Sequence, residues 1–244
     1  FGGADFDEGH DIAVDAAGRT YLTGVTSSGD LETRNAVQPN LRGDRNAFVA
    51  RFSANASEIA YATYLGGTSD FGEAIAVDPD GNAYVAGTAG SEFPLLNSVQ
   101  AGYAGGATDA FVAKLATDGT LAYATYLGGA GADFASDIAS IGSGRAVVVC
   151  FTTSSDFPMI DALQGDLDNA GADAFISIIT VSWFPFLGMG RNSFCRPGCR
   201  RCRDSTGCRG PAHGHEGERE RAGRWKPPGR ELSGKERRDF NAAL

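Results

Sequence analysis

The feature that most constrains the fold of this chain is an internal repeat. The run Tyr61-Ala-Thr-Tyr-Leu-Gly-Gly67 returns 62 residues later as Tyr123-Ala-Thr-Tyr-Leu-Gly-Gly129. The run Asn46-Ala-Phe-Val-Ala-Arg-Phe52 returns 63 residues later as Asp109-Ala-Phe-Val-Ala-Lys-Leu115, and a third time as Asp173-Ala-Phe-Ile-Ser-Ile-Ile179. Because self-similarity at a fixed period indicates a stack of similar structural units, the first three quarters of the chain consist of three such units.

Each unit contains four short runs that are rich in β-branched and aromatic residues and separated by turn-forming Gly, Pro, Asn and Asp. In the second unit the expected strands are Glu73–Val77, Asn82–Thr88, Ala110–Leu115 and Leu121–Tyr126. The segment Asp78-Pro-Asp-Gly81 suits a tight turn, because Pro79 presets φ and Gly81 accepts a positive φ. Four antiparallel strands in a repeated unit are typical of the blades of a β-propeller.

The sequence therefore predicts an all-β fold, a partial β-propeller of four-stranded antiparallel blades followed by an irregular or disordered tail. We expect repeats at residues 1–64, 65–126 and 127–180, and the tail at residues 181–244.

The third repeat is expected to be incomplete. Its turn reads Ile141-Gly-Ser-Gly144, Cys150 replaces the glycine at 87, and no fourth strand follows Ile179. The resulting total of about eleven strands falls short of the four or more blades of a closed ring. We expect either a fragment of a longer propeller or self-association through open sheet edges.

The surplus length of each unit lies between its second and third strands, at Ala89–Thr108 in the second unit. Such a loop is expected to project from one face in every copy, where repeat proteins usually build a binding surface. The partner expected at these loops is a protein or a glycan.

The shared motifs resemble the bacterial β-propeller repeat called SBBP. They are Leu65-Gly-Gly, Ala74-Ile-Ala-Val-Asp78, Gly81-Asn-Ala-Tyr-Val-Ala-Gly87, Phe93-Pro94, Asp109-Ala-Phe-Val-Ala-Lys114 and Tyr123-Ala-Thr-Tyr126. The resemblance implies a propeller of several blades in a bacterial secreted or cell-surface protein. It implies no catalytic residues, because the shared positions are turn and packing positions.

The net charge of −9 is an average over two unlike parts. Residues 1–180 hold 7 Lys and Arg against 23 Asp and Glu, whereas residues 181–244 hold 14 against 7. An acidic surface repels phosphates, so we expect no nucleic-acid partner for residues 1–180. No run reaches the roughly 18 apolar residues of a membrane span, and we expect no signal peptide in this chain.

The basic tail admits four interpretations. Cys195, Cys199 and Cys202 have the C-x3-C-x2-C spacing of an iron–sulfur ligand set, but no accompanying barrel sequence is present. Cys199, Cys202 and Cys208 with His213 or His215 suit zinc in a nucleic-acid-binding module. A disordered basic segment is the third interpretation. The fourth, which we favour as a hypothesis, is a frameshift near codon 180, because the change of composition falls where a fourth strand is due.

Several polar residues of the repeats are candidate sites. Asp78, Asp80 and Asn82 alternate as calcium ligands do, but Ala83 and Ala89 stand where an EF-hand loop requires Gly and Glu, so we expect a hairpin turn.

His10 follows Asp7-Glu8, and we expect it at the surface, where a strand begins. Glu73 and Asp137 are expected to be solvated or channel-facing acids, with a glycan hydrolase or lyase as the alternative.

Tyr61, Tyr64, Tyr123 and Tyr126 are spaced three apart in matching places, so one ring of each pair is expected between blades and the other toward solvent or a loop. Sugar-binding platforms are the alternative for these rings. Asn55-Ala-Ser57 matches a glycosylation acceptor but is expected to form a turn.

From these residues we predict no catalytic, cofactor-binding or metal residues and no cofactor. The predicted function is a non-enzymatic structural or ligand-binding segment of an extracellular or cell-surface protein. The alternatives are the glycan hydrolase or lyase, and a zinc or nucleic-acid-binding tail.

Overall fold

The computed structural model describes residues 1–142, 144–160, 162 and 171–180, which belong to one compact unit. These residues form eleven β-strands in three antiparallel sheets and no helix, which confirms the predicted all-β class. The cluster, zinc, disorder and frameshift interpretations of residues 181–244 lie outside the described residues.

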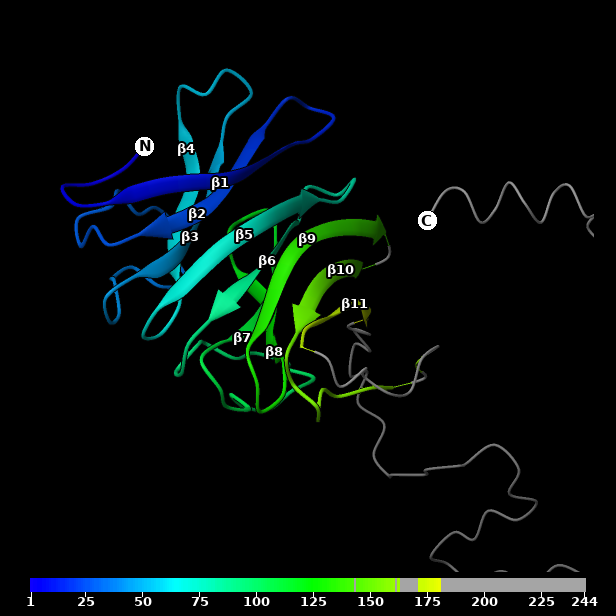
Figure 1. The fold of residues 1–244 in the computed structure, drawn as a ribbon. Helices are drawn as coiled ribbons and strands as arrows, with labels where there is room; N and C mark the ends of the chain where they lie inside the picture. The colour runs from blue at the N-terminus through cyan, green and yellow to red at the C-terminus, as the bar shows by residue number, and fades with distance from the viewer. Residues whose placement is uncertain (143, 161, 163–170, 181–244) are drawn as a thin grey trace, which may run out of the picture. The chain divides into compact units, whose positions relative to one another are not determined.

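Each sheet is one blade, with its strands in sequence order (Figure 1). Blade 1 contains β1 (Asp7–Val14), β2 (Thr20–Thr26), β3 (Asn46–Phe52) and β4 (Ile59–Leu65). Blade 2 contains β5 (Asp70–Val77), β6 (Ala83–Ala89), β7 (Asp109–Leu115) and β8 (Leu121–Leu127). The described part of blade 3 contains β9 (Asp133–Gly142), β10 (Arg145–Thr152) and β11 (Asp173–Thr180).

The observed strands of blade 2 match the predicted ones closely, except that β5 begins three residues early, at Asp70 rather than Glu73. The early residues Phe71 and Gly72 pair with Thr88 and Gly87 of β6. The Asp and Gly at this strand start concealed it, because both residue types are rare inside strands.

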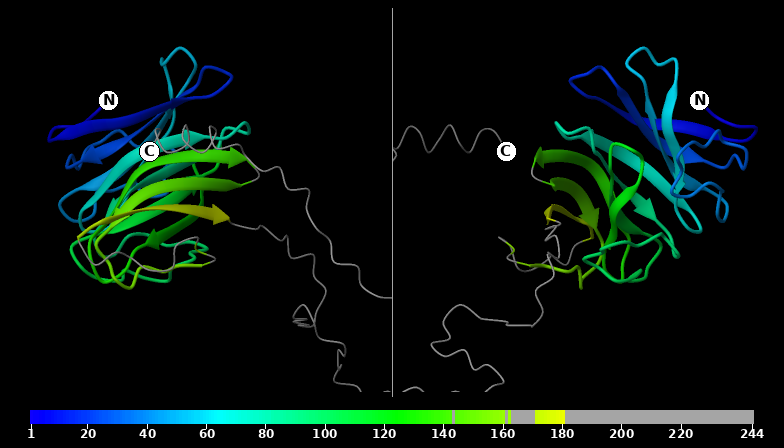
Figure 2. Two further views of the ribbon diagram at one scale, coloured as in Figure 1. Left: turned by 45° about the vertical axis from the view of Figure 1, so that its right-hand side comes forward. Right: turned by 180° about the vertical axis from the view of Figure 1, so that it is seen from behind.

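The blades stack face to face, so that β1 contacts β5 and β5 contacts β9, as both views of Figure 2 show. A hydrophobic core fills each junction. The core between blades 1 and 2 includes Tyr21, Val49, Tyr61, Ile75 and Val85. The core between blades 2 and 3 includes Tyr84, Val112, Tyr123, Ile138 and Val148. Burial between blades, rather than within one sheet, therefore stabilises the stack.

The first strand of every blade contains a β-bulge, at Gly9/Asp11, Gly72/Ala74 and Ala135/Asp137. In blades 1 and 2 a glycine of the second strand faces the bulge. A Cβ on Gly24 would lie 1.9 Å from the carbonyl oxygen of Glu8, and one on Gly87 1.9 Å from that of Phe71. The bulge therefore requires glycine at these two places.

The long loops between second and third strands do not simply project, as expected, but fold back along the fourth strand of their own blade. Arg34 and Ala62 exchange two main-chain hydrogen bonds, and Leu96 and Ala124 do the same in blade 2. The loops thereby pair the outer edge of β4 and β8, which would otherwise present unpaired amides and carbonyls.

Candidate functional site

The bulges place three different polar side chains at one repeated position on the first strands: His10, Glu73 and Ser136. Because β1, β5 and β9 lie side by side, polar side chains at this position can meet across neighbouring blades, as those of His10 and Glu73 do. It is therefore the candidate site for any chemistry at the propeller axis.

His10 lies within strand β1 rather than at its start, and its side chain is 19% exposed. Its Nδ1 is 3.2 Å from Glu73 Oε2 and its Nε2 is 3.7 Å from Glu8 Oε2. The Nδ1 atom is buried and forms no hydrogen bond of good geometry. The expected surface histidine is therefore wrong: the bulge turns His10 toward the neighbouring blade, which its sequence position does not reveal.

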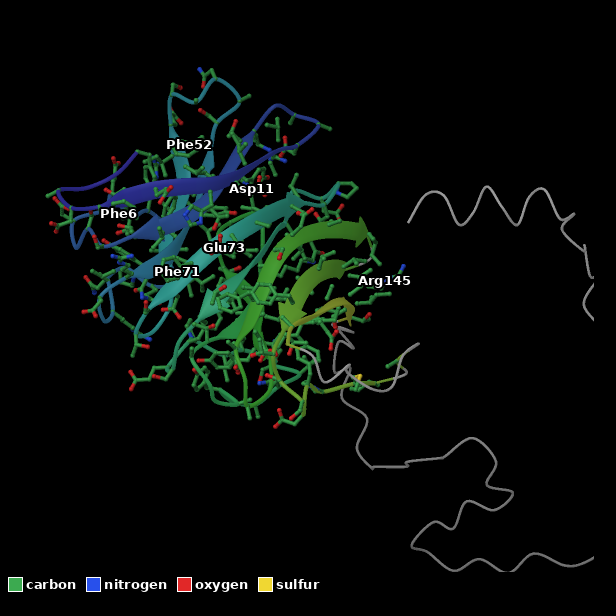
Figure 3. All side chains as sticks on the ribbon, viewed as in Figure 1. Phe6, Asp11, Phe52, Phe71, Glu73 and Arg145 are labelled. Carbon is green, nitrogen blue, oxygen red and sulfur yellow. The ribbon has the colours of Figure 1, made fainter. Side chains whose placement is uncertain are left out.

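Asp11, the residue after the bulge, joins the first two blades. Its Oδ1 accepts the amide of Ile12 at 2.8 Å, and its Oδ2 accepts the amide of Ile75 at 2.8 Å. Asp11 and Glu73 are labelled in Figure 3 on the facing strands β1 and β5. Asp137 holds the matching place in blade 3, is exposed, and accepts the amide of Ile138 at 2.7 Å.

A second set of acids is buried where one blade meets the next. Asp70 accepts the amide of Gly67 at 2.6 Å and the side-chain amide of Asn46 at 3.2 Å. Burial raises the pKa of Asp70 to about 7, although these hydrogen bonds act in the opposite direction.

At the next junction both partners are acids, Asp109 on β7 and Asp133 on β9. Burial, and then the neighbouring Asp133, raise the pKa of Asp109 to about 6. Sequence reasoning missed these carboxylates, because each begins a strand in the shared motif and resembles a turn residue. The available signal was the change from Asn46 to Asp109 within an otherwise constant motif.

The carboxylate of Asp78 is engaged by donors from its own turn and from the neighbouring strands. Asp78 accepts hydrogen bonds from the amides of Asp80 and Asn82 at 3.1 and 2.9 Å, and from the Asn82 side chain at 2.8 Å. Tyr84 Oη donates at 3.1 Å and Lys114 Nζ lies 3.7 Å away. Although burial opposes it, these donors lower the pKa of Asp78. The hairpin-turn interpretation fits these contacts.

The four repeated tyrosines are all buried. Tyr61 and Tyr123 pack in the two junction cores. The hydroxyls of Tyr64 and Tyr126 donate to main-chain carbonyls of their own long loops, at 2.6 and 2.8 Å. The prediction of one ring between blades and one under a loop is confirmed. The sugar-platform alternative is wrong, because none of the rings has an exposed face.

The remaining candidates have local roles. Asn55 Oδ1 accepts from the hydroxyls of Ser53 and Ser57 at 2.8 Å each, as the turn interpretation requires. Burial raises the pKa of the Cys150 thiol to about 12, which leaves it unreactive near neutral pH. Across residues 1–160, apart from 143, and residues 162 and 171–180, no three or more His, Cys, Asp or Glu side chains group as a metal site. No membrane-spanning helix occurs among these residues either.

The comparison with protein families agrees with this geometry. Residues 60–94 match the family model of the SBBP beta-propeller repeat. This segment is similar to an SBBP repeat. The matched SBBP segment runs from β4 of blade 1, through the junction and the bulge of β5, to the loop after β6. It therefore includes Asp70, Glu73 and the Asp78 turn. No curated protein matches the chain.

Proposed function

We propose that residues 1–180 are a non-enzymatic structural and binding segment of a bacterial secreted or cell-surface protein, acting through the two open faces of its outer blades. SBBP repeats are typical of bacterial extracellular proteins, and the matched segment supports this setting. The partner that we propose for the open faces is a second copy of the chain.

The observation that carries the proposal is the outer face of blade 3. Ile176 and Ile178 of β11 are 72% and 61% exposed, and Val149 and Phe151 of β10 are also exposed. By strand register, Ile176 corresponds to Val49 and Val112, which are fully buried. Within the described residues, blade 3 thus leaves exposed the positions that blades 1 and 2 cover with the next blade.

Blade 1 presents the complementary face. Ile12 and Val14 of β1 are 60% and 58% exposed, whereas Ile75, the counterpart of Ile12 in blade 2, is buried against blade 1. Phe1 covers part of this face, with its ring 5.6 Å from that of Phe48. The two open faces are the two halves of one repeated interface.

When two copies join head to tail, the exposed face of blade 3 in each copy is covered by blade 1 of the other. Each copy contributes three blades, so a two-fold ring contains six, within the range of about four to eight blades that closed propellers use. Ring closure removes every unpaired blade face, which is the usual reason that such architectures close.

The test is the molar mass of the full chain in solution, measured with reductant present by sedimentation equilibrium. We expect twice the 25.4 kDa of one chain, and we expect Ile176→Glu to give a folded monomer. Val99→Glu, at an exposed position in the loop of blade 2, is the matched control and leaves the dimer intact. A monomeric wild-type chain, or an Ile176→Glu dimer of unchanged affinity, contradicts the proposal.

The hydrolase or lyase alternative draws support from the contact between His10 and Glu73, whose atoms are 3.2 Å apart. Turnover of an acidic or neutral polysaccharide that Glu73→Gln abolishes, without a change in fold, would replace the non-enzymatic proposal. Binding of a protein or glycan by the long loops remains part of the proposal, restricted to their exposed residues such as Val37 and Val99. Because residues 1–180 are strongly acidic, we propose no nucleic-acid partner for them.

A further inference from the structure

We propose that the junction between blades 2 and 3 binds a calcium ion between Asp109 and Asp133. The ion takes the place that the side-chain amide of Asn46 fills at the junction between blades 1 and 2.

At the first junction, four oxygen atoms surround a single nitrogen. Asn46 Nδ2 donates to the carbonyls of Arg42 and Arg45 at 2.8 and 2.7 Å, and to that of Gly67 at 3.2 Å. It also donates to Asp70 Oδ2 at 3.2 Å. The amide group thus supplies the positive end of a dipole to a pocket of acceptors.

Asp109 occupies the position in blade 2 that Asn46 occupies in blade 1, but its side chain has only acceptor oxygens and no donor nitrogen. Its Oδ2 accepts the amide of Ala104 at 2.8 Å and Gln100 Nε2 at 3.4 Å. Asn46 Oδ1 accepts the same two kinds of donor, a loop amide and a glutamine side chain, at 2.8 and 2.9 Å. Asp109 Oδ1 therefore stands where the nitrogen of Asn46 stands, and it has no proton to donate.

At the second junction a carboxylate oxygen of Asp109 replaces the donor nitrogen of Asn46, while Asp133 Oδ2 accepts the amide of Gly129 at 2.8 Å and the hydroxyl of Ser154 at 2.7 Å. Asp70 Oδ1 at the first junction also has no partner, so the atom that distinguishes the two junctions is Asp109 Oδ1.

Asp109 and Asp133 are both 0% exposed, and the Oδ1 atom of each is buried with no hydrogen-bond partner. Asp109 Oδ1 and Asp133 Oδ2 each lie 2.8 Å from the position that a Cβ on Gly128 would take, so the two carboxylates converge on one small space. Thr108 Oγ1 is a further buried oxygen without a partner.

One main-chain oxygen of the first junction, that of Arg45, has its counterpart at the second junction in Thr108 O. Thr108 O accepts the amide of Asp133 at 2.9 Å, as Arg45 O accepts the amide of Asp70 at 3.2 Å. The groups at this junction are therefore two carboxylates and the carbonyl and hydroxyl oxygens of Thr108, and calcium prefers oxygen ligands of this kind.

When Asp109 and Asp133 are both ionised, a positive charge is needed nearby to stabilise them. Among the described residues, no Lys, Arg or His lies within salt-bridge distance of Asp109 or Asp133. Two buried carboxylates that face each other repel, and an unpaired buried charge is strongly unfavourable. A calcium ion neutralises both groups, and its flexible coordination suits a mixed carboxylate and carbonyl set better than the strict octahedron of Mg²⁺ does.

The experiment uses the full chain after chelator treatment, with calcium chloride as the probe in calorimetric titration and thermal melting. We expect one ion per chain and a rise in melting temperature of about 5 °C at saturation. Asp109→Asn restores the Asn–Asp arrangement of the first junction, so this variant is expected to fold and to lose the calcium response. Asp118→Asn, which changes an exposed turn acid, is the control that keeps it.

The reciprocal variant keeps the proposal falsifiable if Asp109→Asn does not fold. Asn46→Asp recreates the acidic pair at the first junction and is expected to bind a second calcium ion. The proposal is overturned if the wild-type chain neither binds calcium nor changes its melting temperature, which would mean that Asp109 carries a proton instead. It is equally overturned if Asp109→Asn binds calcium as the wild-type chain does.

Discussion

Asp11 accepts the main-chain amide of Ile75 across the junction between blades 1 and 2, at 2.8 Å. Through its other oxygen, Asp11 also accepts the amide of Ile12, so one carboxylate serves the first strands of two blades. We expect Asp11→Ala to destabilise the fold by about 1–3 kcal/mol, because it leaves a partly buried amide without its acceptor.

Urea unfolding, monitored by far-UV circular dichroism, measures this loss of stability. Asp11→Asn retains one acceptor oxygen and is expected to lose less than half as much stability. Equal losses in the two variants would show that the bridge between the blades does not carry the effect.

The repeated tyrosines give an internally matched pair. Tyr64 Oη donates to the carbonyl of Ser28 and accepts the amide of Leu31 at 3.0 Å, whereas the buried Tyr61 hydroxyl has no partner. Tyr64→Phe is therefore expected to cost about 1–2 kcal/mol, while Tyr61→Phe is expected to be neutral or slightly stabilising. Chemical denaturation of both variants checks the difference, and equal costs would contradict it.

Gly87 is expected to tolerate no side chain. A Cβ there would lie 1.9 Å from the carbonyl oxygen of Phe71, which is main chain and is fixed by the bulge. Gly87→Ala should therefore lower stability by more than about 3 kcal/mol or prevent folding. At Gly29, where a Cβ meets nothing within 4 Å, the same substitution should leave the melting temperature within a degree or two of wild type.

The fold was largely predictable from the sequence because the repeat motif occurs three times in it. The strand positions follow from turn segments such as Asp78–Gly81, whose side chains fix the hairpin locally. The bulge at Glu73 was not predictable, because it depends on the pairing of β5 with β6 and on the close approach at Gly87.

The candidate sites were less predictable than the fold. His10 and Glu73 are 63 positions apart in the sequence and meet only when two blades stack. Asp109 and Asp133 read individually as strand-start residues, and only the stacking of blades 2 and 3 makes them a buried pair. Contacts between repeats decide these sites, whereas motif spacing reports contacts within a repeat.

Stability is expected to depend on pH through Asp70. Burial raises the pKa of Asp70 to about 7 in the folded chain, from about 4 in the unfolded chain. The folded state therefore binds the proton more tightly, and its stabilising contribution is complete below about pH 4 and is lost as the pH rises to about 7.

Asp70→Asn removes this titration and is expected to flatten the fall in stability between about pH 4 and 7. Melting temperatures across that range, in buffers of constant ionic strength, provide the measurement. A variant with the same pH profile as the wild-type chain would show that Asp70 does not titrate in this window.

The most direct test of the account is a cross-link between the two open blade faces. At the junction between blades 1 and 2, Thr23 lies against Gly72, since a Cβ on Gly72 would be 2.2 Å from its hydroxyl. By strand register, the same contact between two copies joins Val149 of one to Gly9 of the other. We predict that a mixture of the Val149→Cys and Gly9→Cys chains, one of them isotopically labelled, yields a 9–149 disulfide identified by peptide mass spectrometry. The absence of a 9–149 disulfide under oxidising conditions, while both chains remain folded, would contradict the proposed pairing of the two blade faces.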